Sequence, residues 1–444
     1  MSHSISRRSF IRRATAGALV FPWVASGLRA QSPNGVVHHA SFGCSGMAMS
    51  DISALSKHAA VKVVAGCDVD EKRTAEFRKK FPEARIYTDF RELLEKEKDL
   101  QSVNVSTPDH MHAPIGVTAM NRGLALYGQK PLAHDIYEVR RMTLLARQKK
   151  LVTQMGIQIH SNSEYRTACA LIQAGAIGKV VEVHTWSSKK WGDNDAMPTV
   201  TAEPPEGLDW DKWLGVASAR PFIGNGWYHP GNWRKRLSFG TGTFGDMGCH
   251  IYDPVFKALA LTAPLSVRSE GPSPNQHSWA TNAVIHYVFP GTAYTAEKTV
   301  KVVWYDGDER PPQSVLDAAK IDRAVKGAMP DQGSIFLGTN GAMILPHIAQ
   351  PRLVGTEKTT YEKVAGDNHW LQFIETVLGN RKAADANFDY AGPLTEAVLL
   401  GSVATRFAHQ TLEWDAAALK FPKTPAADQF LKTPYRKGWE VAGL

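Results

Sequence analysis

The sequence predicts an α/β fold in which a doubly wound parallel sheet is followed by an α+β domain with a large, mostly antiparallel open sheet. Three observations support this prediction. Short apolar strands alternate with helix-length segments as far as residue 156, a glycine turn follows the first strand, and the rest of the chain is rich in β-prone segments separated by long loops. With 444 residues, the chain is long enough for two domains with their own cores.

The segment 101–133 organises the first domain. A β-prone run at 102–106 ends before a proline, apolar residues recur at helical spacing over 113–121, and a second apolar strand covers 124–127. A right-handed crossover makes these strands parallel and places the loops after them at the sheet edge where ligands bind. Lys130 lies in the second loop, so we expect its amine to face a ligand. A solvated lysine at a strand exit is the alternative.

A βαβ unit at the start of this domain has the features of a dinucleotide-binding turn. The strand 36–42 is followed by glycines, a helix, the strand 61–67 and then Asp68. The loop can hold a pyrophosphate at the helix N-terminus, and Asp68 can accept hydrogen bonds from ribose hydroxyls. The G-x-G-x-x-G pattern is met here as G-x-S-x-x-A, with Ser45 at the second glycine position. The candidate loop residues are Gly43, Cys44, Ser45, Gly46 and Met47.

The first domain is predicted to span 36–156 and the second 157–444. Further elements of the first domain are helices at 48–58, 71–80, 90–96 and 136–149 and strands at 85–87 and 152–155. Those of the second domain are helices at 163–174, 369–378 and 394–409 and strands at 180–187, 282–289, 299–304 and 334–338. The final segment, to Leu444, is predicted to be a loop anchored by Trp439.

Residues 1–30 have the pattern of a twin-arginine signal peptide. An arginine pair within 6–11 precedes an apolar run at 14–24, which is too short and broken to cross a membrane, and a cleavage site at 28–30. We therefore expect export of the folded protein by the twin-arginine route to the periplasm, with no membrane attachment after removal of the signal. Removal also takes away five arginines and no acidic residue, so the net charge falls from +8 to about +3 and no nucleic-acid-binding surface is expected.

The four cysteines are Cys44, Cys67, Cys169 and Cys249, and they show neither a CxxC pair nor the spacing of metal ligands. Two of them fall in the predicted nucleotide loop and in a predicted core strand. Neither a disulfide framework nor a metal site is therefore expected.

A second stretch with candidate chemistry runs from Phe239 to Asp253. Its glycines lead into a predicted helix on which Asp246 and His250 are four residues apart and share one face. A carboxylate beside an imidazole can fix the tautomer of the ring and raise its basicity, as a general base requires. The alternative is a helix-capping aspartate and a buried, hydrogen-bonded histidine.

Together these motifs resemble the Gfo/Idh/MocA family of oxidoreductases, which includes glucose–fructose oxidoreductase and inositol dehydrogenase. The resemblance covers nearly the whole chain after residue 30. The motifs that carry it occur in this order: 43–47, Asp68, 107–112, 129–131, 154–156 and the Asp246–His250 pair. The segments 209–213 and 233–234 are similar to a subgroup of exported or sugar-processing members.

The resemblance implies an NAD(P)-dependent oxidoreductase that moves a hydride between nicotinamide and a sugar or polyol. Lys130 would stabilise a developing alkoxide, His250 would take the hydroxyl proton, and Asp246 would orient that base or hold the substrate. NAD is expected rather than NADP because Asp68 would repel a 2′-phosphate, although Arg73 follows five residues later. The implied cofactor-binding residues are Gly43, Cys44, Ser45, Gly46, Met47, Asp68, Thr107, Pro108, His110, His112, Gln129, Lys130 and Gln158. Two residues depart from the family pattern, Ser45 in the glycine loop and Gln129 in place of the glutamate of Glu-Lys-Pro.

Aromatic residues are frequent in the loops of the second domain, and the C–H faces of a sugar could pack on them. Core packing or an oligomer interface is the alternative. The candidate substrate residues are Trp191, Tyr228, Trp233, Arg234, Asp246 and His250, and the same loops and strands add Trp186, Trp227 and His229. The resemblance also implies a homodimer or homotetramer assembled through the open face of the second sheet.

Three functions agree with the sequence. The first is a hydride-transferring oxidoreductase with a tightly bound cofactor, because little free nucleotide exists outside the cytoplasm. The second is a redox-neutral, NAD-dependent enzyme that oxidises a sugar transiently, cleaves a glycosidic bond and then reduces the product. The third is a non-catalytic sugar-binding protein of the same fold. Nucleotide bound to the purified protein would exclude this third function.

Overall fold

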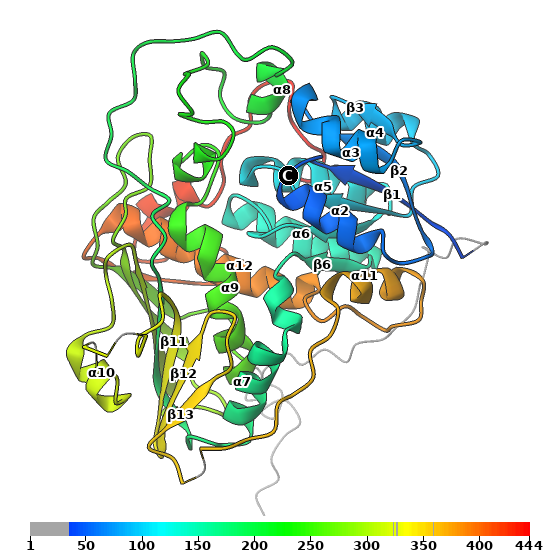
Figure 1. The fold of residues 1–444 in the computed structure, drawn as a ribbon. Coiled ribbons are helices and arrows are strands. Elements are labelled where there is room, and N and C mark those ends of the chain that lie inside the picture. Colours follow the sequence, from blue (N-terminus) through cyan, green and yellow to red (C-terminus); the bar gives the residue numbers. More distant parts are fainter. Residues whose placement is uncertain (1–34, 323, 326, 358) are drawn as a thin grey trace, which may run out of the picture.

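The computed structural model describes residues 35–322, 324–325, 327–357 and 359–444. The predicted signal peptide, residues 1–30, lies outside the described residues. Figure 1 shows a sheet formed by the N-terminal part of the chain, in blue to cyan, and a second sheet beside a group of long helices. Within the described ranges, no helix combines the length and the apolar character that crossing a membrane requires.

Six parallel strands form the first sheet, in the order β3-β2-β1-β4-β5-β6. They are β1 (Val37–Phe42), β2 (Val61–Cys67), β3 (Arg85–Tyr87), β4 (Ser102–Val105), β5 (Ala125–Gly128) and β6 (Thr153–Met155). The helices between them are α2 (Met47–Leu55), α3 (Ala75–Lys80), α4 (Phe90–Lys96), α5 (His112–Asn121) and α6 (Ile136–Lys149). The direction of winding reverses between β1 and β4, which opens a crevice at the carboxyl ends of these strands. The predicted doubly wound sheet is confirmed.

Local chemistry explains where these elements begin. Asp89 caps α4 by accepting a hydrogen bond from the N–H of Arg91 at 2.8 Å, and Asp135 and Glu138 form a capping box at the start of α6. Strands β4 and β5 are buried along their whole length, because helices cover both faces of the sheet.

Eight strands form the second sheet, in the order β13-β12-β11-β7-β10-β9-β8-β14. They are β7 (Val180–Ser187), β8 (Ser266–Ser269), β9 (Val284–Pro290), β10 (Thr299–Asp306), β11 (Gln332–Gly338), β12 (Gly341–Pro346), β13 (Arg352–Val354) and β14 (Thr411–Glu413). The pairing of β7 with β10 is parallel and the others are antiparallel, as predicted. The helices α7 (Ser163–Gln173), α9 (Gly242–Leu259) and α12 (Phe388–Ala404) lie between this sheet and the first domain (Figure 1).

The opposite face of the second sheet is partly covered by the chain itself. The helix α10 (Gln313–Ala318) places Val315 and Leu316 in an apolar cluster with Trp186 and Tyr305. Trp186 is fully buried there, so it is a core residue and not a sugar contact. The oligomeric state, for which this face was expected to serve, stays a prediction.

Two features of the C-terminal part differ from the sequence prediction. Helix α12 begins at Phe388 and ends at Ala404, not at 394 and 409, because Asn387 caps it and Pro393 is accommodated inside the helix. Strands β8, β12, β13 and β14 were also missed. Three of these are only three or four residues long, too short for a period of two to be recognised.

The C-terminal part of the chain also packs on the first domain. Helix α11 (His369–Val377) contributes Phe373, Ile374 and Val377 to an apolar cluster on the first sheet. The final segment runs back over α4, where the ring of Trp439 packs against Phe90 at a centroid distance of 6.4 Å. This contact agrees with the predicted anchor at Trp439.

Candidate active site

The crevice at the carboxyl ends of the first sheet is bounded by the glycine loop after β1. Gly43 has a φ of +96°, and a Cβ at this position would lie 2.8 Å from the carbonyl oxygen of Ser106, so only glycine fits. Gly46 has a φ of +56°, and a Cβ there would meet nothing within 4 Å. The loop therefore approaches β4 closely at one glycine and leaves room for a ligand at the other, directly before the N-terminus of α2.

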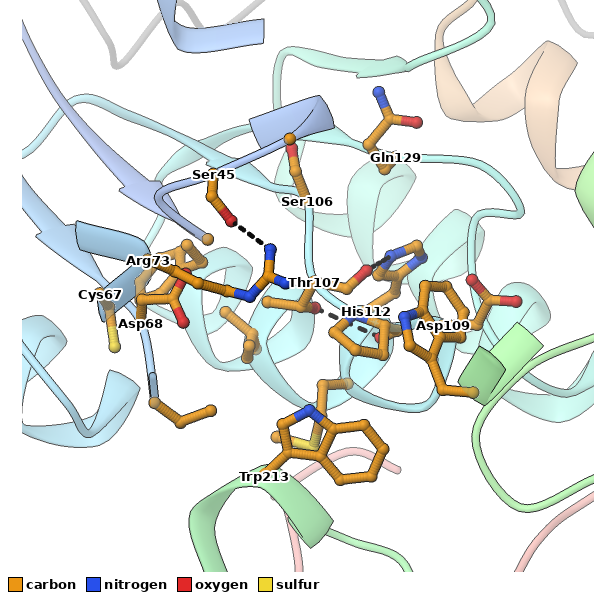
Figure 2. A pocket seen from close by; sticks show the side chains of 18 of the residues that line it. Ser45, Cys67, Asp68, Arg73, Ser106, Thr107, Asp109, His112, Gln129 and Trp213 are labelled. Atoms are coloured by element: carbon orange, nitrogen blue, oxygen red, sulfur yellow. Dashed lines mark hydrogen bonds between the residues drawn. The ribbon is translucent and has the colours of Figure 1, made fainter. Parts of the chain in front are cut away.

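Asp68 ends β2 and faces the same crevice. Its carboxylate accepts hydrogen bonds from the N–H groups of Cys44, at 2.9 Å, and Asp70, at 3.1 Å, and burial raises its pKa. Arg73 also lines the crevice, where its Nη1 donates to the hydroxyl of Ser45 at 3.1 Å (Figure 2). This end of the crevice thus presents a carboxylate, which suits ribose hydroxyls, next to a guanidinium group.

Lys130 and Asp246 form an ion pair at the other end of the crevice. The Nζ of Lys130 donates to Oδ1 of Asp246 at 2.5 Å and to its carbonyl oxygen at 2.9 Å. Trp191 Nε1 and Lys189 Nζ donate to Oδ2 at 2.9 and 3.4 Å. Arg234 Nε lies 3.6 Å from Oδ1. Burial alone would raise the pKa of Asp246, but the charge of Lys130, followed by those of Lys189 and Arg234, lowers it below its ordinary value. Asp246 is therefore a carboxylate held among three cations.

His250 lies one helical turn after Asp246 on α9, as predicted, but the two side chains are not hydrogen-bonded to each other in the described structure. The carboxylate of Asp246 is engaged by Lys130 instead. The Nδ1 of His250 is buried and has no hydrogen-bond partner among the described residues. Burial lowers the pKa of His250 well below its ordinary value, and the nearby charge of Lys130 and the ring of His347 lower it further. His250 is thus a neutral imidazole, and neither of its ring nitrogens has a hydrogen-bond partner among the described residues.

Gln129 precedes the lysine and contacts a buried carboxyl group. Its amide nitrogen donates to Oδ2 of Asp51 at 2.8 Å, and the hydroxyl of Ser106 donates to the same oxygen at 2.9 Å. Trp370 Nε1 donates to the other oxygen at 3.0 Å. Burial raises the pKa of Asp51 to about 6. A carboxyl group therefore lies next to the loop of Lys130, although it comes from α2 and not from position 129.

His112 connects two of the loops that line the crevice. Its Nδ1 lies 2.8 Å from the backbone carbonyl oxygen of Pro131. Its Nε2 lies 2.8 Å from that of Thr107 (Figure 2). The ring therefore fixes the loop after β4 relative to the loop that carries Lys130.

Most of the predicted cofactor and substrate residues line one cavity. These are Gly43, Ser45, Gly46, Met47, Asp68, Thr107, Pro108, His112, Gln129, Lys130, Trp233, Arg234 and Asp246. The predicted residues that do not line it are Cys44, His110, Gln158, Trp191, Tyr228 and His250. Trp191 and His250 nevertheless lie close to its far end, one bonded to Asp246 and the other a helical turn from it.

The remaining predicted residues have structural positions. Cys44 is buried beneath the glycine loop and takes part only through its N–H. His110 and Tyr228 are each 2% exposed and pack around Trp213, at centroid distances of 5.8 and 6.3 Å. Gln158 begins a short 3₁₀ turn outside the cavity. These four side chains do not face the crevice, so we do not assign them to ligand binding.

Some residues that reach the cavity from distant segments were not predicted from the sequence. Phe90 comes from α4, Trp213 from the short helix α8 (Trp210–Leu214), and Trp439 from the C-terminal segment. Figure 2 shows Trp213 across the crevice from Ser45 and Arg73. Asp51 and Lys189 were missed as well. No local motif marks these residues, and the tryptophan-rich run at 210–213 is the one signal that pointed to them.

These features fit a nicotinamide dinucleotide: a glycine where a Cβ would clash, a carboxylate at the end of β2 and a lysine at the far end. Fold and crevice together define a dinucleotide-binding Rossmann protein with an added α/β domain. Two family profiles match the chain. One is described as "Oxidoreductase family, NAD-binding Rossmann fold", over residues 37–157, and the other as "Oxidoreductase family, C-terminal alpha/beta domain", over residues 171–441. The protein belongs to the Gfo/Idh/MocA oxidoreductase family.

Individual relatives are distant. Levoglucosan dehydrogenase of Pseudarthrobacter phenanthrenivorans is 23% identical over 192 residues, which are 43% of this chain and 40% of that protein. Inositol 2-dehydrogenase of Salmonella typhimurium is 31% identical over 127 residues, 28% of this chain and 37% of that protein. The aligned part of the chain thus spans less than half the length of these relatives. The WlbA dehydrogenase of Chromobacterium violaceum, in complex with NADH and UDP-GlcNAcA, has the same fold, with a TM-score of 0.61, 14% identity and coverage of 87% of this chain and 98% of that one.

Proposed function

We propose that this protein is an NAD-dependent oxidoreductase that moves a hydride to or from a carbon atom of a sugar or polyol. The observation that carries the proposal is the position of Lys130, held by Asp246 at the end of the nucleotide crevice. The relatives named as levoglucosan and inositol dehydrogenases support a substrate of the sugar or polyol class. When bound, the nicotinamide supplies the hydride acceptor or donor.

The side chains at the end of the crevice supply proton handling and charge stabilisation. The amine of Lys130 is mostly buried, with 14% of the side chain exposed, so its charge can stabilise an alkoxide in a weakly screened site. His250 can accept the hydroxyl proton, because its imidazole is neutral and neither ring nitrogen has a hydrogen-bond partner among the described residues. Asp246 positions Lys130 and is not a proton acceptor, because its pKa is lowered.

We further propose that the nucleotide stays bound between turnovers. The segment around α8 is tied to the end of β2, where Asp209 N–H donates to the carbonyl of Val69 at 2.9 Å. His229 Nε2 lies 2.9 Å from Oδ2 of Asp70, and Trp439 closes the cavity from the C-terminal segment. These contacts hold the segments that border the cavity in place, which supports slow exchange of a bound nucleotide. Retention would suit the export and periplasmic location that residues 1–30 predict.

NAD is proposed as the cofactor in preference to NADP. The carboxylate of Asp68 would repel a 2′-phosphate and accept hydrogen bonds from free ribose hydroxyls. Arg73 is the group that would favour NADP, but it already contacts Asp70 at 3.4 Å and Ser45. Calorimetric titration of nucleotide-free protein with both nucleotides tests this choice, and tighter binding of NADP would contradict it.

A redox-neutral cycle remains the second candidate. A retained nucleotide that is reduced and then reoxidised in place agrees with two reactions. One is the transient oxidation of a glycoside, and the other is a net redox reaction. The two are separated by analysing the products of a sugar or glycoside panel incubated with the loaded protein. Oxidised sugar or a reduced second substrate supports the oxidoreductase, and cleaved glycoside without net oxidation supports the alternative.

A further inference from the structure

The end of the cavity beyond Lys130 carries more positive charge than the proposed reaction needs. Lys130, Lys189 and Arg234 all approach the carboxylate of Asp246, at 2.5, 3.4 and 3.6 Å. Lys130 and Arg234 line the cavity, and Lys189 reaches the carboxylate from the loop after β7. Lys130 alone suffices to stabilise an alkoxide, and the carboxylate of Asp246 balances its charge. The other two positive charges have no role in the proposed chemistry.

Nearby titratable groups do not restore the balance. Asp109 is a carboxyl group of the cavity wall near Lys130 and Arg234; it accepts a hydrogen bond from Thr241 at 2.8 Å, and burial raises its pKa. Even when Asp109 is ionised, the cations outnumber the carboxylates. Burial lowers the pKa of His250 well below its ordinary value and that of His347 to about 4, and the charge of Lys130 acts in the same direction on both. Both rings are therefore neutral at pH 7.

Of the basic residues adjacent in sequence, Lys190 is balanced by a carboxylate of its own, whereas Lys235 and Arg236 share one carboxylate. Lys190 Nζ lies 2.6 Å from Asp308, and Lys235 and Arg236 lie 3.5 and 3.0 Å from Asp193. Neither Lys235 nor Arg236 lines the cavity, so the excess charge that a bound substrate would meet lies on the side chains that converge on Asp246.

Arg234 is held in a way that leaves its donors available. Its guanidinium carbon lies 4.2 Å from the ring centroid of Trp233 and 5.5 Å from that of Trp191. Rings contact the flat faces of a guanidinium group, whereas its N–H donors lie in the plane and form a fork that matches a carboxylate or phosphate group. Among the described residues, no hydrogen bond engages its terminal nitrogens.

We propose that the substrate is an anionic sugar, whose carboxylate or phosphate group is bound by Arg234 and Lys189 while its reacting hydroxyl faces Lys130. This inference rests on the proposed function, because it takes Lys130 as the group that faces the reacting carbon. It adds that the substrate carries a negative charge of its own.

The test measures binding of matched neutral and acidic sugars to the nucleotide-loaded protein. The pairs are glucose with glucuronate and galactose with galacturonate, with glucose 6-phosphate as a third anion, and dissociation constants are obtained by calorimetry at two salt concentrations. We expect an anionic member to bind at least about tenfold more tightly than its neutral partner, with a preference that falls as salt rises. Tighter binding of the phosphate ester would assign a phosphate group, and tighter binding of a uronate a carboxylate.

Two variants connect the preference to the proposed residues. Arg234→Gln and Lys189→Gln should each reduce the preference for the anion severalfold, whereas the matched control Lys190→Gln removes the same charge one residue away and should preserve it. Equal or tighter binding of the neutral sugars, or a preference that survives both variants, would overturn the proposal. Binding does not require turnover, so the two proposals can fail separately. Reduction of bound nucleotide by neutral sugars alone would reject only the anionic substrate, and tight anion binding with no redox change would reject only the oxidoreductase.

Discussion

The amide group of Gln129 donates to the buried carboxyl group of Asp51, and this contact supplies a carboxyl beside the loop of Lys130 where the family pattern has a glutamate. Position 129 lies 78 residues from Asp51 in the chain, and α2 brings the two together. A glutamate at position 129 would place a second carboxylate against that of Asp51 unless one of the two is protonated. The departure from the family pattern at Gln129 is therefore compensated within the fold.

Gln129→Glu should destabilise the protein. Two buried carboxyl groups would then compete for one proton, which should lower the free energy of unfolding by about 1–3 kcal/mol. Chemical denaturation at neutral pH measures this loss. The double variant Gln129→Glu/Asp51→Asn exchanges the two groups and should recover most of it. If the double variant instead loses as much free energy of unfolding as the two single variants together, the contact between residues 129 and 51 is not the cause of the loss.

Asp51 should also give the stability of the protein a specific pH dependence. Its pKa in the folded protein is about 6, above the ordinary value of 3.8, so folding favours its protonated form. The contribution of Asp51 to the free energy of unfolding is fully present below about pH 4 and is lost as the pH rises through about 6. The loss is at most about 3 kcal/mol. Asp51→Asn cannot ionise, so the stability advantage of the native protein over this variant should shrink between about pH 4 and about pH 7. A constant difference across this range would contradict the assignment.

Lys130→Ala and His250→Ala should each lower turnover by about 10²–10⁴-fold while nucleotide binding and thermal stability are retained. Single-turnover reduction of the bound nucleotide by an active sugar measures the effect. The matched control is His347→Ala, because this histidine lies beside His250, with ring centroids 5.9 Å apart, and has no proposed role in proton transfer. Near-native rates in both test variants would mean that these residues are structural.

Trp439→Ala should accelerate the release of bound nucleotide. The indole lines the cavity, so its removal opens one wall without touching the glycine loop. The fraction of nucleotide that remains after a fixed time of dialysis should fall severalfold. Val441→Ala changes a residue of the same segment that does not line this cavity, and it should release nucleotide at the native rate. Equal retention of nucleotide in both variants would show that Trp439 does not hold the nucleotide in the cavity.

The parts of the fold that follow from local patterns were predictable. The alternation of strands and helices predicts the parallel sheet and the loops that carry the glycine turn, Asp68 and Lys130. The topology of the sheet then places these loops at one edge. The short edge strand β13 and the start of α12 were not predictable, because three residues show no periodicity and a proline inside a helix reads as its beginning.

The site was predictable as a set of residues but not as a set of contacts. Helical spacing put Asp246 and His250 on one face, yet Lys130, which is 116 residues away in sequence, takes the carboxylate. Tyr228 is a candidate sugar contact in the sequence because it lies in an aromatic loop. In the folded chain it lies in an aromatic core. Pairing across the domains depends on tertiary packing, on which a single sequence carries no periodic signal.

The measurement that tests the central claim most directly is activity without added nucleotide. The full-length protein is expressed, purified and dialysed extensively, and sugars are then added while the redox state of the bound nucleotide is followed by absorbance. We expect NAD at about one molecule per chain, reduced by a sugar and reoxidised when a second carbonyl substrate is supplied. Protein that carries no nucleotide and binds neither NAD nor NADP at millimolar concentrations would contradict it.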